Sequence, residues 1–216
     1  MLKLCSVRKS YGATPILRDI QLELASGEYI AIMGESGVGK STLLNLIAGL
    51  DLPDAGSIYF DGFELGALSE PERTRVRRTH MGFVFQSFHL LPHLTVAQNV
   101  GLPLLLNGIA GEQAQARIAQ CLGAVGLEPW SDRFPRELSG GEMQRTAIAR
   151  ALVHSPKLVL ADEPTGNLDP DSASRVLALF RDQVAARGSA AVLVTHSGIA
   201  ASSADRVFVL NSTGLN

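Results

Sequence analysis

A short glycine-rich segment of the chain has the residue types and spacing that bind phosphate groups. It matches the pattern G-x-x-x-x-G-K-[ST] at every fixed position. Its glycines let successive backbone N–H groups wrap around phosphate oxygens, and Lys40 adds a positive charge. The Ser41 hydroxyl is a ligand that Mg²⁺ accepts, with Thr42 expected one phosphate further back. The predicted loop consists of Gly34, Glu35, Ser36, Gly37, Val38, Gly39, Lys40, Ser41 and Thr42.

Two adjacent carboxylates end an apolar run, Leu158–Pro164. Asp162, at the tip of the predicted strand, is placed to hold Mg²⁺ through a water molecule. Glu163 follows it and points elsewhere, which suits a general base for an attacking water. The alternative is a solvated acidic turn without a chemical role, and the phosphate loop upstream favours catalysis.

Two more polar residues end predicted strands, namely Gln86 after "GFVF" and His196 after "AAVLVT". Ligands of parallel sheets bind outside the carboxyl ends of the strands, so both side chains are candidates for the same site. Gln86 is expected to reach Mg²⁺ or the attacking water. The alternatives are a structural histidine and an ordinary amide.

A second helix start also has the features of a phosphate site. The stretch "LSGGEMQR" (Leu138–Arg145) predicts a glycine turn opening a helix, so Ser139, Gly140 and Gly141 would present free N–H groups at the positive end of the helix dipole. A chain of this size usually has one nucleotide site, so the second start needs a reason.

The elements around these residues indicate an α/β fold. Apolar runs rich in valine and leucine predict strands of a largely parallel sheet at 29–33, 157–164, 190–196 and 206–210. Alternation over Asp19–Leu24 predicts a strand with one buried face. Strand signals vanish from 87 to 137, where "EQAQARIAQCLGAVG" has helical spacing. We predict a helical subdomain over 87–137, inserted into a core formed by 1–86 and 138–216.

The composition argues against two classes of function. A net charge of −2 gives no overall basic field of the kind that nucleic-acid binders use. The longest apolar runs are shorter than the roughly twenty residues that span a bilayer.

The one basic run, Arg73–His80, is interpreted as a solvated helix face rather than an anion site. Cys5 and Cys121 are expected to be reduced thiols in apolar surroundings.

These motifs together resemble the nucleotide-binding subunits of ABC transporters along almost the whole chain. The resemblance is carried by "GESGVGKST", "LSGGE", "LVLADEP", "NLD" and "TH". It implies a P-loop ATPase core with a mostly parallel sheet, a small antiparallel β portion and a helical subdomain. It also implies that ATP binds together with Mg²⁺ and is hydrolysed to ADP and phosphate.

The resemblance further assigns roles to single residues. Tyr11 would stack on adenine, for which its ring offers a flat apolar platform. Gln86 would be the Q-loop glutamine, Asp169 would belong to the D-loop, and His196 would contact the γ-phosphate. Two subunits would meet head to tail, so that Ser139–Gly141 of one closes over the ATP held by the other. That arrangement would explain the second phosphate-binding helix start.

A finer resemblance concerns "GFVFQSFHLLPHLTVAQNV" and "LPLLLNG", which are similar to lipoprotein-releasing and macrolide-exporting ATPases, with cell-division ATPases nearby. It implies a cytoplasmic protein, peripheral on the inner face of the cell membrane. A transmembrane permease would dock on the helical subdomain, and the ATPase partner would be a second copy or a paralogue. Leu90, Leu91, Leu94 and Val96 would form either the docking surface or local core.

Two other functions stay open at this point. One is a soluble ABC ATPase that acts on DNA ends, on ribosomes or in iron–sulfur assembly. DNA-repair members need a long coiled coil between the phosphate loop and the "LSGGE" motif, and this chain has no room for one. Ribosome-acting members usually join two cassettes in one chain, and this chain has one. Iron–sulfur assembly members are single cassettes, so they are harder to distinguish from a transporter subunit. The other is a regulatory binding module without turnover, against which Glu163 and His196 argue.

Overall fold

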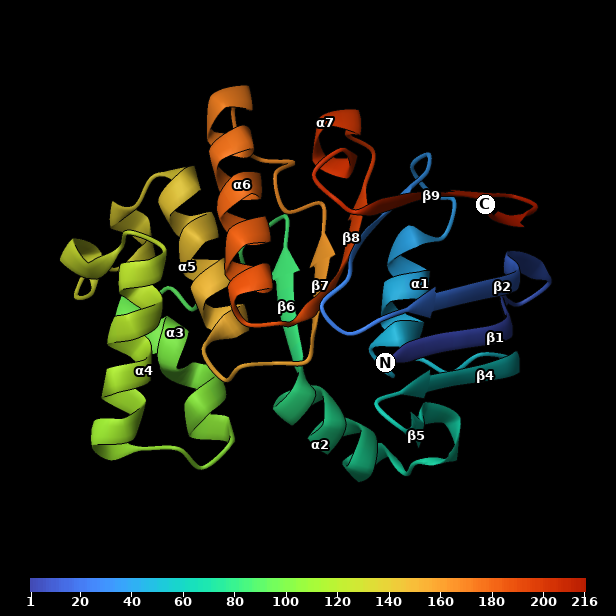
Figure 1. Ribbon diagram of the computed structural model, residues 1–216, viewed down its shortest axis with the longest axis horizontal. Coiled ribbons are helices and arrows are strands. Elements are labelled where there is room, and N and C mark those ends of the chain that lie inside the picture. Colours follow the sequence, from blue (N-terminus) through green and yellow to red (C-terminus); the bar gives the residue numbers. More distant parts are fainter.

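Two β-sheets organise the chain in the computed structural model, which describes residues 1–216 (Figure 1). The larger sheet has the strand order β10-β9-β3-β8-β7-β6 and the smaller one the order β2-β1-β4-β5. The strands are β1 (Leu2–Tyr11), β2 (Thr14–Leu24), β3 (Tyr29–Met33), β4 (Ala55–Phe60), β5 (Phe63–Glu64), β6 (Met81–Phe85), β7 (Leu158–Asp162), β8 (Ala190–Thr195), β9 (Arg206–Asn211) and β10 (Gly214–Leu215).

The helices cover both faces of the larger sheet (Figure 1). They are α1 (Lys40–Ile47), α2 (Glu70–His80), α3 (Val96–Leu106), α4 (Gly111–Ala124), α5 (Gly140–Leu152), α6 (Pro170–Ala186) and α7 (Gly198–Ala201), with single 3₁₀ turns η1 (Leu65–Ala67), η2 (Glu128–Trp130) and η3 (Pro135–Glu137). No helix is both long and apolar enough to cross a membrane.

The larger sheet is parallel from β6 to β9, and only β10 runs antiparallel to its neighbour. Strands β7 and β8 are buried almost throughout because helices lie on both sides of them. Burial on both faces explains their continuous apolar runs, whereas β9 has several exposed residues. The predicted α/β fold with a mostly parallel sheet is confirmed.

The smaller sheet is antiparallel and contacts the larger one both through α1 and directly, where β2 meets β10. One apolar cluster contains Leu4 and Phe60 of the smaller sheet, Leu43 of α1, and Ile32 and Val192 of the larger sheet. Helix α1 therefore lies between the two sheets (Figure 1). Strand β2 starts at Thr14 rather than at residue 19, because its pairing with β1 continues to Tyr11.

The helical side of the molecule has its own apolar cluster. It joins α3 and α4 to Leu138, Ala149 and Val153, which lie at or beyond the predicted boundary at 137. The division at 87–137 stays a prediction. Four apolar residues were predicted to form either a docking surface or local core. Of these, Val96 is buried, Leu91 is exposed, and Leu90 and Leu94 are half-buried.

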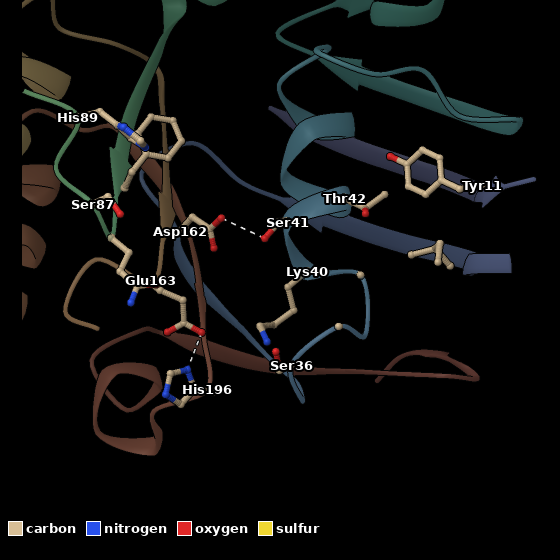
Figure 2. Close-up of a pocket in the computed structure, with 15 residues that line it drawn as sticks. Tyr11, Ser36, Lys40, Ser41, Thr42, Ser87, His89, Asp162, Glu163 and His196 are labelled. Carbon is tan, nitrogen blue, oxygen red and sulfur yellow. Dashed lines mark hydrogen bonds and ion pairs between the residues drawn. The ribbon is translucent and has the colours of Figure 1, made fainter. Parts of the chain in front are cut away.

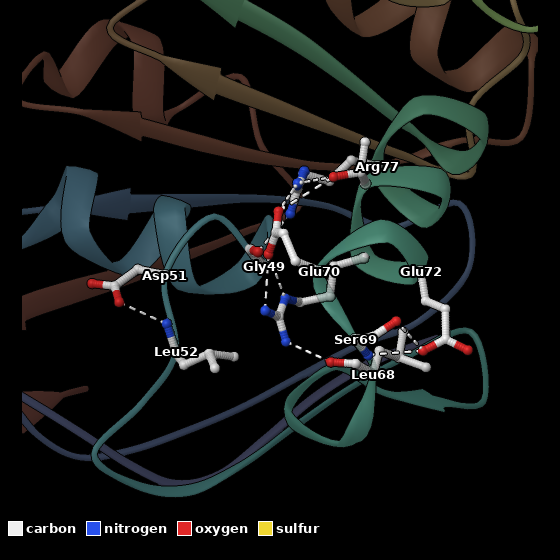
Figure 3. Close-up of polar contacts among 10 residues, drawn as sticks. Gly49, Asp51, Leu52, Leu68, Ser69, Glu70, Glu72 and Arg77 are labelled. Atoms are coloured by element: carbon white, nitrogen blue, oxygen red, sulfur yellow. Dashed lines mark hydrogen bonds and ion pairs between the residues drawn. The ribbon is translucent and has the colours of Figure 1, made fainter.

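The basic run on α2 differs from its predicted state (Figure 3). The side chains of Arg73 and Arg77 are only 12% and 13% exposed, and both pair with Glu70. Arg73 also donates to the carbonyl of Leu68, and Arg77 donates to that of Gly49. The solvated-face interpretation is therefore wrong for these two arginines. They tie α2 to the turns beside it, which a charge count cannot reveal.

The two cysteines are unpaired, as predicted. Cys121 is buried within the cluster of the helical side, and Cys5 is half-buried on β1.

Candidate functional site

A cavity of about 800 Å³ opens at the carboxyl ends of the central parallel strands (Figure 2). Its volume lies within the range of small-molecule sites. Eleven of the residues that line it were predicted from the sequence, namely Tyr11, Ser36, Gly37, Gly39, Lys40, Ser41, Thr42, Gln86, Asp162, Glu163 and His196. The remaining lining residues are Ile16, Phe85, Ser87 and His89.

Strand register brings these residues together. Phe85 is opposite Asp162, Asp162 is opposite Val194, and Met33 is opposite Thr195. The strands therefore end at one level, and the next residue of each begins a loop at the same edge of the sheet. Gln86, Glu163 and the phosphate loop are adjacent for this reason, although they lie far apart in the sequence.

The phosphate loop has backbone conformations that require glycine. Gly37 and Gly39 have φ angles of 80° and 109°, in the region that side chains disfavour. A Cβ atom at Gly39 would also lie 2.7 Å from Cγ2 of Ile16. Val38 packs against the large apolar cluster. Lys40 Nζ donates to the carbonyls of Gly34 and Glu35 at 2.8 and 2.9 Å, so the charge stands inside the loop.

Two side-chain oxygen groups meet next to Lys40, one from α1 and one from the end of β7. Ser41 Oγ donates to Asp162 Oδ2 at 3.1 Å. Burial raises the pKa of Asp162, as does the nearby charge of Glu163, while Ser41 and Lys40 oppose the shift. A cation here would offset the poor solvation of this carboxylate. The Ser41 hydroxyl and the Asp162 carboxylate are oxygen groups of the kind that Mg²⁺ accepts alongside waters and substrate phosphates.

Glu163 is oriented by two hydrogen bonds from the end of β8. His196 Nδ1 lies 2.7 Å from Glu163 Oε1, and Thr195 Oγ1 donates to Glu163 Oε2 at 3.1 Å (Figure 2). The backbone of Glu163 is left-handed, with φ of 47°, and its N–H donates to Val194. This unfavourable conformation turns the side chain toward His196, away from the Asp162–Ser41 pair.

Gln86 and Tyr11 stand on different walls of the cavity. Gln86 exchanges two hydrogen bonds with Asn167: its Nε2 donates to Asn167 Oδ1 at 3.1 Å, and its carbonyl accepts from Asn167 Nδ2 at 3.0 Å. Tyr11 is 52% exposed, and its hydroxyl donates to Asp51. The Tyr11 ring is therefore held in place at the rim beside the start of α1 (Figure 2).

The predicted residues Ser139, Gly140, Gly141 and Asp169 do not line this cavity. Ser139 caps α5 and its hydroxyl donates to Glu142 Oε2. Asp169 caps α6 by accepting from the N–H of Ser172. The second helix start therefore does not contribute to the cavity of its own chain.

Sequence analysis missed several residues of the site. Thr195 directly precedes His196, and its position at the end of a buried strand was a usable signal. Ile16, Phe85 and His89 carry no such signal, because a lone apolar or aromatic side chain in a loop or strand does not indicate a ligand.

Comparison with known proteins places this geometry in a family. The sequence profile described as ABC transporter matches residues 17–166. The chain belongs to the ABC transporter family. As an ABC cassette it binds and hydrolyses ATP as the ATP-binding subunit of a transporter, and the predicted resemblance is confirmed.

Named relatives of this ABC cassette include the lipoprotein-releasing system ATP-binding protein LolD 1 of Rhodospirillum rubrum. It is 44% identical over 213 residues, which cover 97% of this chain and 94% of that protein. LolD of Saccharophagus degradans is 42% identical, and the match covers 100% of this chain and 96% of that protein. The macrolide export ATP-binding/permease protein MacB of Salmonella paratyphi A is 42% identical over 98% of this chain, but the match spans only 33% of MacB.

Solved structures of ABC cassettes match the fold closely. The dimeric post-hydrolysis state of the cassette MJ0796, bound to ADP and Pi, has a TM-score of 0.89 at 38% identity and covers 100% of this chain and 97% of that one. The cassette cbiO1 of Clostridium perfringens, part of the complex cbiONQ, has a TM-score of 0.91 at 30% identity. The match covers 100% of this chain and 86% of that one.

Lys40→Ala is expected to weaken ATP binding by the cassette roughly tenfold to a hundredfold. The substitution removes charge-assisted hydrogen bonds to phosphate that contribute about 1.5–3 kcal/mol. Titration with a fluorescent ATP analogue measures the change. Lys157→Ala, which removes a lysine paired with Asp61 outside the cavity, is the matched control. Equal affinities of the two variants would contradict a role of Lys40 in binding.

Proposed function

We propose that this ATPase works as a head-to-tail dimer on a transmembrane permease of the lipoprotein-release and macrolide-export type. The observation that carries the catalytic part is the single cavity that holds Lys40, Ser41, Asp162, Glu163 and His196. Lys40 and the N–H groups of the loop bind the phosphates of ATP, and Tyr11 supports the adenine ring.

Hydrolysis uses the groups at the strand ends. Glu163 takes a proton from water while the water oxygen bonds the γ-phosphorus and the bond to the bridging oxygen breaks, leaving ADP and phosphate. Gln86 orients that water, and His196 contacts the γ-phosphate from the far side. Ser41 and Asp162, with Gln86, would hold Mg²⁺, which supplies charge neutralisation on the phosphate oxygens.

The dimer gives the second phosphate-binding helix start a partner. The first N–H groups of α5 have no carbonyl one turn earlier to pair with, so Gly140 and Gly141 can donate to an anion. Because they lie outside the cavity of their own chain, we assign them, with Ser139 and Asp169, to the ATP of a second subunit. The dimeric MJ0796 structure supports this arrangement. The second subunit is a copy of this chain or a paralogue.

A second hollow supplies the surface for the permease. This docking groove, of about 680 Å³, lies between α2, α3, α5 and β6, and it contains Met81, Phe83, Leu102, Pro103 and Leu106. Its polar lining residues include Arg78, Arg150, His89 and His154, together with Arg77, whose charge is paired with Glu70, and no acidic side chain lines it. An apolar groove with cationic edges fits a short amphipathic helix that carries a carboxylate.

The occupant of the docking groove is a cytoplasmic segment of the permease. Support comes from MacB, whose name joins ATP-binding and permease functions, and from the LolD relatives, which are parts of a releasing system. The chain would thereby be held at the inner face of the membrane, with no nucleic-acid partner.

Leu106→Glu is expected to abolish copurification of an integral membrane protein with the tagged chain from detergent-solubilised membranes. With the helix docked, a carboxylate at this position would be buried against the apolar face of the helix and would repel its acidic group. Leu105→Glu is the matched control, because Leu105 is 67% exposed, against 61% for Leu106, but does not line the groove. Both variants should retain basal ATPase activity.

Retention of the membrane protein by the Leu106 variant, or its loss from both variants, would contradict docking in this groove. Copurification of a soluble assembly complex from wild type would instead support the iron–sulfur alternative, which the relatives do not favour.

A further inference from the structure

The segment after β6 contains two consecutive residues in an unfavourable backbone conformation. Phe88 and His89 have φ angles of 58° and 48°, in the left-handed region that non-glycine residues rarely occupy. Such strain persists only where surrounding contacts hold it. The segment must therefore be held by something outside itself.

The group that holds it is Arg150, on the last turn of α5. Its Nη1 donates to the carbonyl of His89 at 2.6 Å, and its Nη2 donates to the carbonyl of Phe88 at 2.7 Å. The two terminal nitrogens of the planar guanidinium thus bind two successive carbonyls. A flexible ammonium cannot reproduce this fork.

Arg150 has no carboxylate partner, although ten other pairs of charged groups are present. Burial lowers its pKa. A largely buried cation that binds only neutral carbonyls is unfavourable in itself, which distinguishes Arg150 from Arg73 and Arg77 with their shared Glu70.

The segment that Arg150 holds lies between the ATP cavity and the docking groove. Phe85 and His89 line both the ATP cavity and the docking groove, and their rings pack edge to face with centroids 5.0 Å apart. Figure 2 shows His89 beside Ser87 at one end of the cavity. Gln86 lies between Phe85 and His89 in the sequence, and Asn167 binds both its side-chain amide and its backbone carbonyl.

We propose that Arg150 is a positioning residue for ATP hydrolysis: its fork holds Phe88 and His89 in the left-handed conformation that presents Gln86 to the cavity. This inference rests on the proposed role of Gln86. Without the fork, the segment relaxes toward ordinary backbone angles and Gln86 leaves its place, while the phosphate loop and the ATP affinity are little affected.

Arg150→Met is expected to lower kcat by about tenfold or more, because a small misplacement of a positioning group has effects of this size. KM should change by less than about threefold, since the phosphate loop is intact. Arg150→Lys keeps the charge without the fork and should give an intermediate kcat. It also provides the comparison if the methionine variant does not fold. A wild-type kcat in the folded variants would overturn the inference.

Rescue by glycine separates positioning from general stabilisation. Glycine adopts positive φ without strain, so Phe88→Gly added to Arg150→Met should recover at least about threefold of the lost kcat. Phe88→Ala removes the same ring but keeps the Cβ, and should not rescue. Equal recovery with alanine and glycine, or none with glycine, would overturn the inference.

Gln86→Ala, measured in parallel, distinguishes this inference from the function on which it rests. If Gln86→Ala hydrolyses ATP like wild type, the role of Gln86 fails and the inference fails with it. If Gln86→Ala is impaired while Arg150→Met is not, only the role of Arg150 is rejected.

Discussion

Glu163→Gln is expected to bind ATP nearly as tightly as wild type and to hydrolyse it about 10²–10⁴-fold more slowly. The glutamine amide keeps the shape of the side chain, including a partner for Thr195, but cannot accept the proton of the attacking water. Phosphate release gives the rate, and titration with a fluorescent ATP analogue gives the affinity. The variant should accumulate as an ATP-bound dimer in size-exclusion chromatography.

Glu112→Gln is the matched control, because Glu112 is exposed at the start of α4 and lies outside the cavity. Its turnover and elution should equal those of wild type. Turnover of the Glu163 variant within threefold of wild type, about 0.65 kcal/mol in barrier height, would show that Glu163 is not the general base.

Mixing two inactive variants, Lys40→Ala and Gly141→Asp, is expected to restore part of the ATPase activity. Gly141→Asp aims a carboxylate at the γ-phosphate, where like charges repel. The backbone tolerates this residue: a Cβ at Gly141 would have only an ordinary contact, 3.9 Å from Ser172. Gly140 is a poorer choice, since its Cβ would lie 3.2 Å from Leu168.

The recovery follows from head-to-tail pairing. A mixed dimer has one site with both mutations and one site that joins the intact phosphate loop of the Gly141→Asp chain to the intact helix start of the other. An equal mixture should therefore contain about one quarter of the wild-type number of intact sites. Activity should fall on dilution as dimers dissociate. If both motifs served one ATP within one chain, mixing would restore nothing.

If both ATP sites of a dimer must hydrolyse together, the mixed dimer would also be inactive. The formation of ATP-dependent dimers in the mixture is therefore measured as well. Each variant alone is the control and should stay inactive. Absence of both activity and dimers in the mixture, while wild type shows both, would reject the assignment of Ser139–Gly141 to a partner's ATP.

The parts of the fold and site with local signals were predictable from the sequence. Apolar runs identified β3, β7 and β8 because strands buried on both faces leave little choice of residue. The phosphate loop was predictable because its backbone needs positive φ angles at Gly37 and Gly39, which glycine adopts readily. Parallel strands then put Gln86, Asp162 and His196 at one edge, and the cavity contains all three.

Other features depend on contacts between distant segments, and no local pattern reveals them. The sequence predicts a surface charge at Arg77, because its hydrogen bond to the carbonyl of Gly49, in a distant turn, is visible only in the structure. Arg150 reads as one more polar residue of an amphipathic helix, although it binds carbonyls more than sixty positions away in the chain. Ile16 belongs to the site only because the loop at Gly39 packs directly against β2.

The same packing of Gly39 against Ile16 has a consequence for the whole molecule. Tyr11 and Ile16 belong to the smaller sheet, whereas Asp162 ends β7 and His196 follows β8 of the larger one, so the walls of the cavity come from both. A nucleotide that touches residues from both sheets adds a link to those already made by α1 and by the contact of β10 with β2. ATP binding is therefore expected to stabilise the packing of the two sheets against each other, and its release to remove that stabilisation.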